Sequence, residues 1–438
     1  MIITNFQNLA KNDLRKKALE IAEAGYEAID IEKAVRDRIK IENNFLKVIK
    51  TPTILKDSVH SEAEINLNNF KRIFIVGIGK GSALASAKLT EILGNRLTGG
   101  IVLDREIPKL EIKNLKLEIY AGTHPFPSKQ NIEATKKIIK LAENLNENDL
   151  LINFICGGGS ALACASEKDM EDSIKAIKLL TKAGATIEEL NIVRKHLSEF
   201  KGGGFAKIVY PATVVSLIVS DVCGNELSTV ASGPTVFDKT TVLDAENVLN
   251  KYNLNLKDFN LHETPKDKKC FDKVYNILFA CNQDAIMGML KKSEEIGLKS
   301  EIYSLALQGE AREVLSQMAE KINNKDLLIA AGETTITFKK LPADKGGRNM
   351  EAVLGALAKC QDLVFMSFAS DGHDNTEAAG AIGDNLTLEK AKESNLNIED
   401  FLETHNSFEF FEKTGDLIFT EKKCFNVADL MLVLRLSK

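Results

Sequence analysis

The loop Gly77-Ile78-Gly79-Lys80-Gly81-Ser82 places a lysine among glycines, between an apolar run and an amphipathic one. Backbone N–H groups at the start of a helix favour anions, and glycines let a phosphate come close to the chain. The loop is neither a Walker A motif nor a dinucleotide fingerprint, because Ser82 replaces the third glycine of Gly-x-Gly-x-x-Gly. Taken alone, it fits a tight turn with a solvated lysine equally well.

A second glycine loop, Gly157-Gly158-Gly159-Ser160, follows another apolar run. Three successive glycines and a hydroxyl are typical of an anion-binding nest, with a flexible turn as the alternative. The order Gly-Gly-Gly-Ser is not the Gly-x-Ser-x-Gly nucleophile elbow, so it does not support a serine hydrolase. Arg194 begins the basic segment Arg194-Lys195-His196 before a third glycine run at 202–204. Such charges usually form a solvated helix face.

Carboxylates follow other apolar runs, among them Asp221, Glu333 and Asp371. Mg²⁺ is usually held by one or two carboxylates together with substrate phosphates, although a single aspartate there is as often a helix cap or a turn residue. Arg348, after Gly346-Gly347, has the fork that grips a phosphate or carboxylate, or it is an ordinary surface arginine. Anion-binding loops, cations and metal-compatible carboxylates together favour phosphoryl transfer, which depends mainly on positioning and charge stabilisation.

The loops with these residues follow apolar runs that alternate with amphipathic segments. The runs are Arg72–Val76, Asp149–Cys156, Ala212–Ser220, Lys273–Ala280, Asp326–Ala331 and Asp362–Ala369. Strands that are apolar throughout belong to sheets covered on both faces, and alternation with helices predicts a mainly parallel α/β sheet. Ligands bind beyond the carboxyl ends of such strands, so we expect all six loops at that edge. Apolar spacing predicts helix through the first 50 residues.

The composition is that of a globular protein, with 44% hydrophobic and 27% charged residues and a net charge of −5. This balance argues against a sequence-independent nucleic-acid binder, which needs a basic surface. We expect no membrane span and no secretory signal. Seven cysteines without a CxxC pair predict reduced thiols, a cytoplasmic location and no zinc site. The predicted partners are therefore small molecules, and the oligomeric state is left open.

A polar segment, 238–273, is the expected boundary between two domains, 1–260 and 270–438. The chain also resembles the type II glycerate kinases over some 300 residues. The stretches that carry this resemblance, in family order, are Gly77–Ser82, Gly122–Pro127, Cys156–Leu162, Asn191–Ser198 with Lys201–Gly203, Ser220–Val222, Ala231–Thr235, Gly332–Thr335, Gly346–Asn349, Ser370–Gly372 and Ala378–Ala381.

The resemblance implies a larger Rossmann-like N-terminal domain, a smaller α/β C-terminal domain known as MOFRL, and an active site in the cleft between them. It implies ATP- and Mg²⁺-dependent phosphorylation of D-glycerate at the 2-hydroxyl, giving 2-phosphoglycerate and ADP. Lys80 matches the family lysine that acts on the transferring phosphoryl group, and Arg348 matches the arginine that faces it from the second domain.

Finer roles are assigned from charge and loop position. Asp221 is the leading candidate for Mg²⁺ or for orienting the hydroxyl, with Glu333 as a second metal ligand. Arg194 is assigned to the glycerate carboxylate, with Lys80 beside the substrate. The residues assigned to the nucleotide are Gly79, Gly157, Gly158, Gly159, Ser160, Asn282, Glu333 and Asp371.

The sequence departs from the family pattern most clearly near its end. The family commonly has Thr-Gly-Pro-Thr-Gly-Thr-Asn-Val there, whereas this chain has Thr420-Glu421-Lys422-Lys423-Cys424-Phe425-Asn426-Val427. A kinase for another small hydroxy or sugar acid therefore remains an alternative, as does a non-catalytic nucleotide-binding protein. A hydroxypyruvate reductase is a third alternative, against which the missing dinucleotide fingerprint argues.

Overall fold

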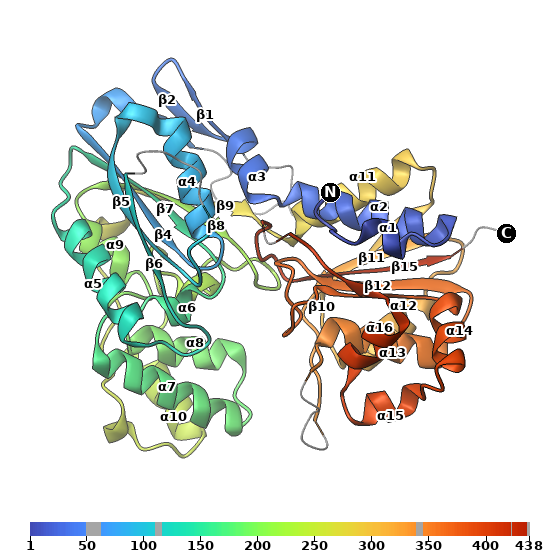
Figure 1. Ribbon diagram of the computed structural model, residues 1–438. Helices are drawn as coiled ribbons and strands as arrows, with labels where there is room; N and C mark the ends of the chain where they lie inside the picture. Colours follow the sequence, from blue (N-terminus) through green and yellow to red (C-terminus); the bar gives the residue numbers. More distant parts are fainter. Residues whose placement is uncertain (50–62, 110–115, 339–344, 422, 436–438) are drawn as a thin grey trace. The chain divides into compact units, whose positions relative to one another are not determined.

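The computed structural model describes residues 1–49, 63–109, 116–338, 345–421 and 423–435 (Figure 1). The chain forms two compact units. One is continuous, Ala34–Ala280, and is called the continuous unit below. The other combines Met1–Lys33 with Cys281–Lys438 and is called the discontinuous unit. The chain passes between them within α3 (Ile31–Arg38) and again after Ala280.

The continuous unit is built on a six-stranded, wholly parallel sheet with the strand order β6-β5-β4-β7-β8-β9. Its elements are β1 (Ile39–Glu42), β2 (Phe45–Val48), β3 (Ala63–Asn66), β4 (Arg72–Ile78), α4 (Ser82–Leu93), β5 (Leu97–Asp104), β6 (Leu117–Ala121), α5 (Lys129–Glu143), β7 (Asp149–Ile155), α6 (Gly159–Leu162), α7 (Glu167–Lys182), α8 (Ile187–His196), α9 (Gly204–Val209), β8 (Thr213–Val219), α10 (Val242–Lys251) and β9 (Val274–Ala280). Strands β1, β2 and β3 form a separate antiparallel sheet.

The parallel sheet is covered on both faces, and its strand order predicts where a ligand would bind. Every residue of β7 and β8 is buried, because helices cover both faces. Ile138 of α5 and Val209 of α9 share a cluster with Val76 on one face, and Ser86 of α4 lies against Gly77 on the other. In chain order the strands run 3-2-1-4-5-6, the Rossmann arrangement, so the order reverses between β4 and β7. Ligands bind at such a reversal, beyond the strand ends.

The discontinuous unit has a mixed sheet of six strands in the order β10-β11-β15-β12-β13-β14. Its elements are α1 (Phe6–Leu9), α2 (Asp13–Ala28), α11 (Asn282–Glu295), β10 (Ser300–Leu307), α12 (Ala311–Glu320), β11 (Leu327–Gly332), α13 (Arg348–Lys359), β12 (Leu363–Ala369), β13 (Gly380–Gly383), α14 (Asn385–Glu393), α15 (Ile398–Glu403), α16 (Ser407–Thr414), β14 (Leu417–Ile418) and β15 (Asp429–Arg435). β15 is antiparallel to both of its neighbours, β11 and β12. The carboxyl ends of β11 and β12 therefore share an edge with the start of β15.

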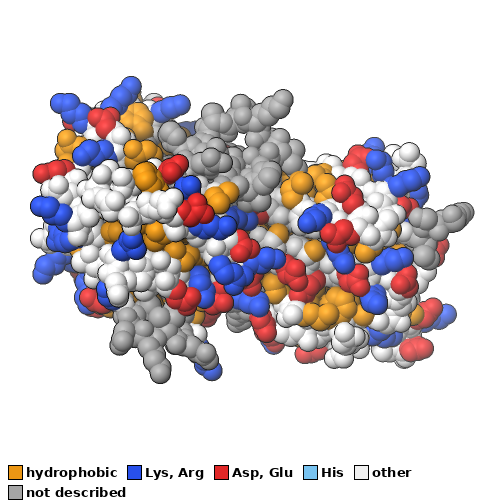
Figure 2. All heavy atoms as spheres, turned by 90° about the horizontal axis from the view of Figure 1, so that it is seen from above, with side chains coloured by type: hydrophobic (Ala, Val, Ile, Leu, Met, Phe, Trp, Pro, Cys, Tyr) orange, Lys and Arg blue, Asp and Glu red, His pale blue; other side chains and the backbone are white. Residues whose placement is uncertain are grey.

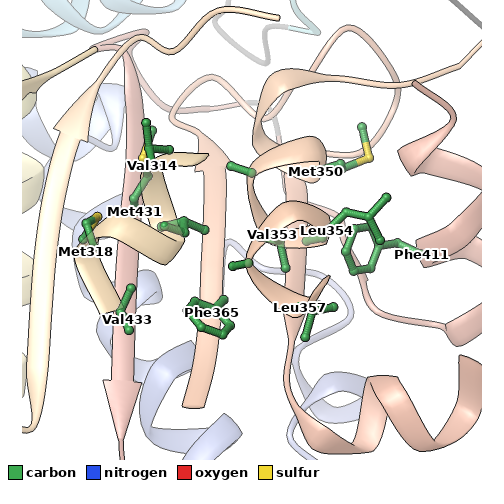
Figure 3. Close-up of a cluster of buried hydrophobic side chains, with 14 of the residues drawn as sticks. Val314, Met318, Met350, Val353, Leu354, Leu357, Phe365, Phe411, Met431 and Val433 are labelled. Atoms are coloured by element: carbon green, nitrogen blue, oxygen red, sulfur yellow. The ribbon is translucent and has the colours of Figure 1, made fainter. Parts of the chain in front are cut away.

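Helix α13 is the centre of the core of this unit. Figure 3 shows Val353 and Leu357 of α13 beside Phe365 of β12, and Leu354 beside Phe411 of α16. All five side chains are buried, and burying an aliphatic or aromatic side chain contributes about 1.5–3 kcal/mol. This packing fixes the helix and with it the position of its first residue, Arg348.

The N-terminal helices belong to this unit because they bury charged and apolar groups in it. The guanidinium of Arg15 is fully buried and bonds to Asp384 at 2.6 Å and to Asp416 at 2.7 Å. Helix α2 also packs closely on α11, where a Cβ on Gly288 would lie 2.6 Å from the carbonyl oxygen of Ala24. A buried arginine without these carboxylates would be strongly destabilising, so α2 requires the C-terminal part of the chain.

The observed division differs from the expected domains 1–260 and 270–438. Residues 1–33 pack with the C-terminal segment, and β9 extends the continuous unit to Ala280. Both differences arise because contacts between distant parts of the chain decide which unit a segment belongs to. Arg15 pairs with Asp384 and Asp416, which lie more than 360 positions away in the chain. Strand β9 completes the parallel sheet of the continuous unit as its edge strand.

All six predicted strands are confirmed, as β4, β7, β8, β9, β11 and β12. The parallel arrangement is right for the continuous unit, whereas the second sheet is mixed, so the six loops lie at two different sheets instead of one edge. The helix expected through residue 50 is wrong after Arg38, because Ile39–Glu42 and Phe45–Val48 pair as a hairpin. Lys50 itself lies outside the described residues.

None of the helices in the described ranges has the length and hydrophobicity that a membrane span requires. Figure 2 shows Lys and Arg interspersed with Asp and Glu on the visible face of both units.

Candidate functional site

The loops after β4, β7 and β8 meet at the strand reversal of the parallel sheet. The N–H of Lys80 donates to the carbonyl oxygen of Gly157 at 3.0 Å. A Cβ on Gly157 would collide with the carboxylate of Asp221. A Cβ on Gly158 would lie 3.2 Å from His124 and 3.6 Å from Cγ of Lys80. The structure thus brings together Lys80, the glycine loop and Asp221, as the shared strand edge predicts.

The Gly79–Ala83 turn does not offer its amides to a ligand. Gly79 N–H donates to Leu103 and Ser82 N–H donates back to Gly79, while Gly81 and Ala83 donate to the carboxylate of Asp104. The expectation that Gly79 and its neighbours bind a phosphate through the backbone is therefore wrong for this turn, because Asp104, at the end of β5, already occupies the start of α4. The side chain of Lys80 is what this turn presents.

Asp104 is a residue that the sequence reasoning missed. Its side chain is buried, and burial raises its pKa to about 6 although three backbone N–H groups oppose that shift. A signal existed in the sequence, since Asp104 ends the apolar run of residues 101–103 just as Asp221 ends another.

The Gly157–Ser160 loop is different because some of its amides remain open. Among the described residues, the N–H groups of Gly157 and Gly158 have no hydrogen-bond acceptor. Gly158 has a φ of +79°, which a residue with a side chain adopts at a cost. Successive amides in such a turn form a concave site for an anion, so this loop fits the predicted phosphate site better than the Lys80 turn does.

Ser160 belongs to a chain of polar side chains that leads to α8. Its Oγ lies 2.9 Å from Oγ of Ser232, which lies 3.3 Å from Oδ1 of Asn191. Arg194 follows Asn191 by one turn of α8, so both lie on neighbouring parts of one helix face. The Nε of Arg194 is buried and has no hydrogen-bond partner within the described ranges, and burial lowers the pKa of Arg194 to about 10. The charge of Asp169 acts on this guanidinium without hydrogen-bonding its buried Nε, and such a group fits an anionic ligand.

The neighbouring lysines have structural roles. Lys195 is buried, and its Nζ lies 3.1 Å from Oδ1 of Asp238. Lys201 is also buried, and its Nζ lies 3.6 Å from Oδ1 of Asp169. The solvated helix face considered for the basic segment Arg194-Lys195-His196 is therefore wrong for Lys195. The amides of the 202–203 glycines donate to the carbonyl oxygens of Ser232 and Gly233, which fixes that turn.

In the discontinuous unit, two carboxylates hold Arg348. Its Nε lies 2.5 Å from Asp429, and a terminal nitrogen lies 2.5 Å from Glu333. Asp429 begins β15 and is fully buried, whereas the side chain of Glu333, after β11, is 52% exposed. The pairs raise the pKa of Arg348 even though burial opposes them. The arginine is thus an ordered, charged group at the shared edge of β11 and β15, and Asp429 is a second residue that the sequence reasoning missed.

The start of α13 is closed in the same way as that of α4. The N–H of Met350 donates to Asp374 at 2.9 Å, and the side chain of Asn349 donates to it at 3.2 Å. Asp374 is buried, and burial with the nearby charge of Asp429 raises its pKa to about 7. The helix start therefore binds the protein's own carboxylate.

Two other predicted residues, Asn282 and Asp371, lie in the discontinuous unit. Asn282 begins α11, donates to the carbonyl oxygen of Leu305 at 2.8 Å, and has a buried Oδ1 without a partner in the described part of the chain. Asp371 follows β12 and accepts from the N–H of His373 at 3.1 Å. Among the described residues, no group of three or more His, Cys, Asp or Glu could hold a metal ion.

The unusual Thr420–Phe425 segment lies against the loop that contains Asp371. A Cβ on Gly372 would collide with the hydroxyl of Thr420, and Ser370 accepts from the N–H of Val427 at 2.8 Å. The N–H of Phe425 donates to the carbonyl oxygen of Ile29, so the N-terminal part of the chain also contacts the Thr420–Phe425 segment. Lys422 lies outside the described residues.

Comparison with known proteins gives the family. The model described as a domain of unknown function (DUF4147) matches residues 17–260, and the MOFRL family model matches residues 326–429. A glycerate 2-kinase from Pyrococcus horikoshii is 32% identical over 454 residues, covering 97% of this chain and 98% of that protein. The crystal structure of glycerate kinase from Thermotoga maritima matches with a TM-score of 0.79 and 31% identity, covering 96% of this chain and 99% of that one. A putative hydroxypyruvate reductase from Agrobacterium vitis is 33% identical over 385 residues, 83% of this chain and 87% of that protein. Because the likeness extends over nearly the whole sequence and includes both family models, this chain belongs to the family of the glycerate 2-kinases.

Proposed function

We propose that the protein transfers the γ-phosphoryl group of ATP to the 2-hydroxyl of D-glycerate, giving 2-phosphoglycerate and ADP. The observation that carries this proposal is the cluster at the strand reversal, where Lys80 and Asp221 flank a glycine loop with open amides. The names of the relatives, glycerate 2-kinase and glycerate kinase, support the same activity.

The continuous unit supplies the charges that this reaction needs. In phosphoryl transfer, negative charge spreads over the equatorial oxygens, and a lysine ammonium beside them stabilises it. We assign that role to Lys80 and assign phosphate oxygens to the amides of Gly157 and Gly158. Arg194 binds the glycerate carboxylate in this proposal, because its buried Nε has no hydrogen-bond partner among the described residues.

Asp221 is the residue that fits a divalent cation or the reacting hydroxyl. Its carboxylate lies against Gly157, beside the proposed phosphate site. Mg²⁺ needs few protein carboxylates when phosphates and water complete its shell, so a single aspartate fits, and the ion would neutralise phosphate charge there. Glu333 fits less well, because it already pairs with Arg348 at 2.5 Å.

The discontinuous unit contributes Arg348 in this proposal, with Asn282 and Asp371 assigned to the nucleotide. The guanidinium of Arg348 is already ordered by Asp429 and Glu333, so little conformational entropy is lost when it binds a phosphoryl oxygen. That it reaches the same phosphoryl group as Lys80 stays a prediction, as does the cytoplasmic location.

A coupled assay for ADP release tests the activity. We expect ADP from ATP and D-glycerate, and no consumption of NADH or NADPH with hydroxypyruvate. Consumption of the nicotinamide without ADP formation would establish the reductase alternative, which the name of the Agrobacterium vitis relative raises. A screen of three- to six-carbon hydroxy acids separates glycerate from other acceptors, and ATP binding without turnover of any acid would contradict an enzymatic role.

A further inference from the structure

The turn at 231–233 in the continuous unit is strained and lies directly on the proposed phosphate loop. Ala231, Ser232 and Gly233 have φ values of +49°, +59° and +59°, and the first two are not glycine. Side chains rarely adopt this region, and such residues cluster where a precise arrangement is needed. A Cβ on Gly159 would lie 2.7 Å from Cβ of Ala231, so the turn packs against the loop that contains Ser160.

Surrounding structure holds the turn firmly. The N–H of the glycine at 202 donates to the carbonyl oxygen of Ser232 at 2.8 Å, and that of the next residue donates to Gly233 at 2.8 Å. Ser232 itself is fully buried. Its hydroxyl is therefore fixed between Ser160 and Asn191.

The hydrogen bonds of this chain determine which way the Ser160 hydroxyl points. Ser232 donates its proton to Oδ1 of Asn191 at 3.3 Å. A serine hydroxyl has one proton, so when Ser232 gives its proton to Asn191, Ser160 is the donor in the 2.9 Å contact between the two serines. The Oγ of Ser160 is left with lone pairs only. It can accept a hydrogen bond from a ligand, and it has no proton for a phosphate or carboxylate oxygen.

We propose that Ser160 recognises a neutral hydroxyl of the acceptor substrate, and that Ser232 and Asn191 are positioning residues that hold it as an acceptor. This inference rests on the proposed glycerate kinase activity and replaces the nucleotide role first expected for Ser160. The reacting 2-hydroxyl must lose its proton, and a serine that already donates its own proton is no base for it. The structure therefore assigns Ser160 to the 3-hydroxyl, the group that distinguishes D-glycerate from D-lactate.

The test compares these two acids in the full-length protein. A site built to bond a hydroxyl rejects the analogue that lacks it. We therefore expect the kcat/KM of wild type to be about 100-fold or more higher for D-glycerate than for D-lactate. If D-lactate acts only as an inhibitor, its Ki should exceed the KM of D-glycerate by the same factor. Ser160→Ala should lower this preference about tenfold or more through weaker use of D-glycerate, with the KM for ATP unchanged. An equal loss on both acids, or a raised KM for ATP, would overturn the inference in favour of a phosphate role.

Variants of the strained turn separate the hydroxyl from the strain. Ser232→Ala removes the hydroxyl and keeps the strain, whereas Ser232→Gly removes both, and we expect both to lose acid discrimination as Ser160→Ala does. Ala231→Gly relaxes the backbone, keeps the hydroxyl and should keep the discrimination. Discrimination retained in a folded Ser232→Ala variant overturns the positioning role. Failure of wild type to release ADP with D-glycerate would instead refute the proposed function and this inference with it.

Discussion

Two helix starts, one in each unit, carry the cations assigned to the phosphoryl group. At the start of α4 the Lys80 turn bonds to the buried Asp104, and at the start of α13 the backbone after Arg348 bonds to the buried Asp374. Burial raises the pKa of Asp104 to about 6 and contributes to raising that of Asp374 to about 7. In both, the helix dipole already acts on a carboxylate of the protein.

The two helix starts differ in what fixes the cation. Arg348 is held at its guanidinium by Asp429 and Glu333, and the Lys80 turn is held at its backbone, where the N–H of Lys80 donates to Gly157. Glycine-flanked helix starts therefore need not be anion sites themselves. Here they serve to present a cationic side chain, and the open amides lie in the separate Gly157–Ser160 loop.

The largest expected effect is the loss of Lys80. Lys80→Ala should lower kcat about 10³-fold, because removing one group that stabilises transition-state charge typically costs 10²–10³. The fold should persist, since the side chain is only partly buried. Steady-state kinetics with thermal unfolding measure this, and Lys88→Ala on the same helix, which removes an ion pair with Glu91, is the control. Turnover within about tenfold of wild type in a folded Lys80→Ala variant would contradict the role of this lysine.

Arg348→Lys should have the next largest effect, a loss of about 10²-fold in kcat. An ammonium cannot bond Asp429 and Glu333 and still present a planar fork to a phosphoryl oxygen. Arg36→Lys, at an exposed ion pair with Asp37, is the matched control and should keep wild-type turnover. Arg348→Lys turnover within about twofold of wild type would contradict a transition-state role for this arginine.

Gly157→Ala tests the open loop. The added methyl group would collide with Asp221, so we expect kcat/KM to fall about tenfold from displacement of that carboxylate. Gly99→Ala is the control, because its Cβ would lie 3.7 Å from the nearest atom, a carbonyl oxygen of Lys116. Equal activity of the two variants would mean that the position of Asp221 does not matter for the reaction.

The smallest effect concerns the pH dependence of stability. The pKa of Asp104 is raised to about 6 in the folded protein, so the native state binds its proton more tightly than the unfolded chain does. Its contribution to stability is present at low pH and is lost as the pH rises through about 6, an expected change of about 2 kcal/mol between pH 4.5 and 8. Asp104→Asn should remove this part of the slope in denaturant unfolding measured at both pH values. A slope as steep as that of wild type would contradict the raised pKa.

Much of the architecture could be predicted from local patterns. The uniformly apolar runs predict buried parallel strands, and β4, β7 and β8 indeed bring Lys80, the glycine loop and Asp221 to one edge. The helix expected beyond Arg38 failed because alternating polar residues at 39–48 pair as strands, a tertiary choice that helical spacing does not reveal.

The sequence by itself determined the strands, the glycine loops and the identity of the two cations, because those depend on residue type and near neighbours. Only the tertiary structure decided that residues 1–33 join the C-terminal part, that Asp104 closes the Lys80 turn, and that Asp429 holds Arg348. These contacts join residues between 21 and more than 360 positions apart. These contacts depend on which strands pair and on which buried charges require a partner of opposite charge. Residue type and near neighbours in the sequence determine neither of these.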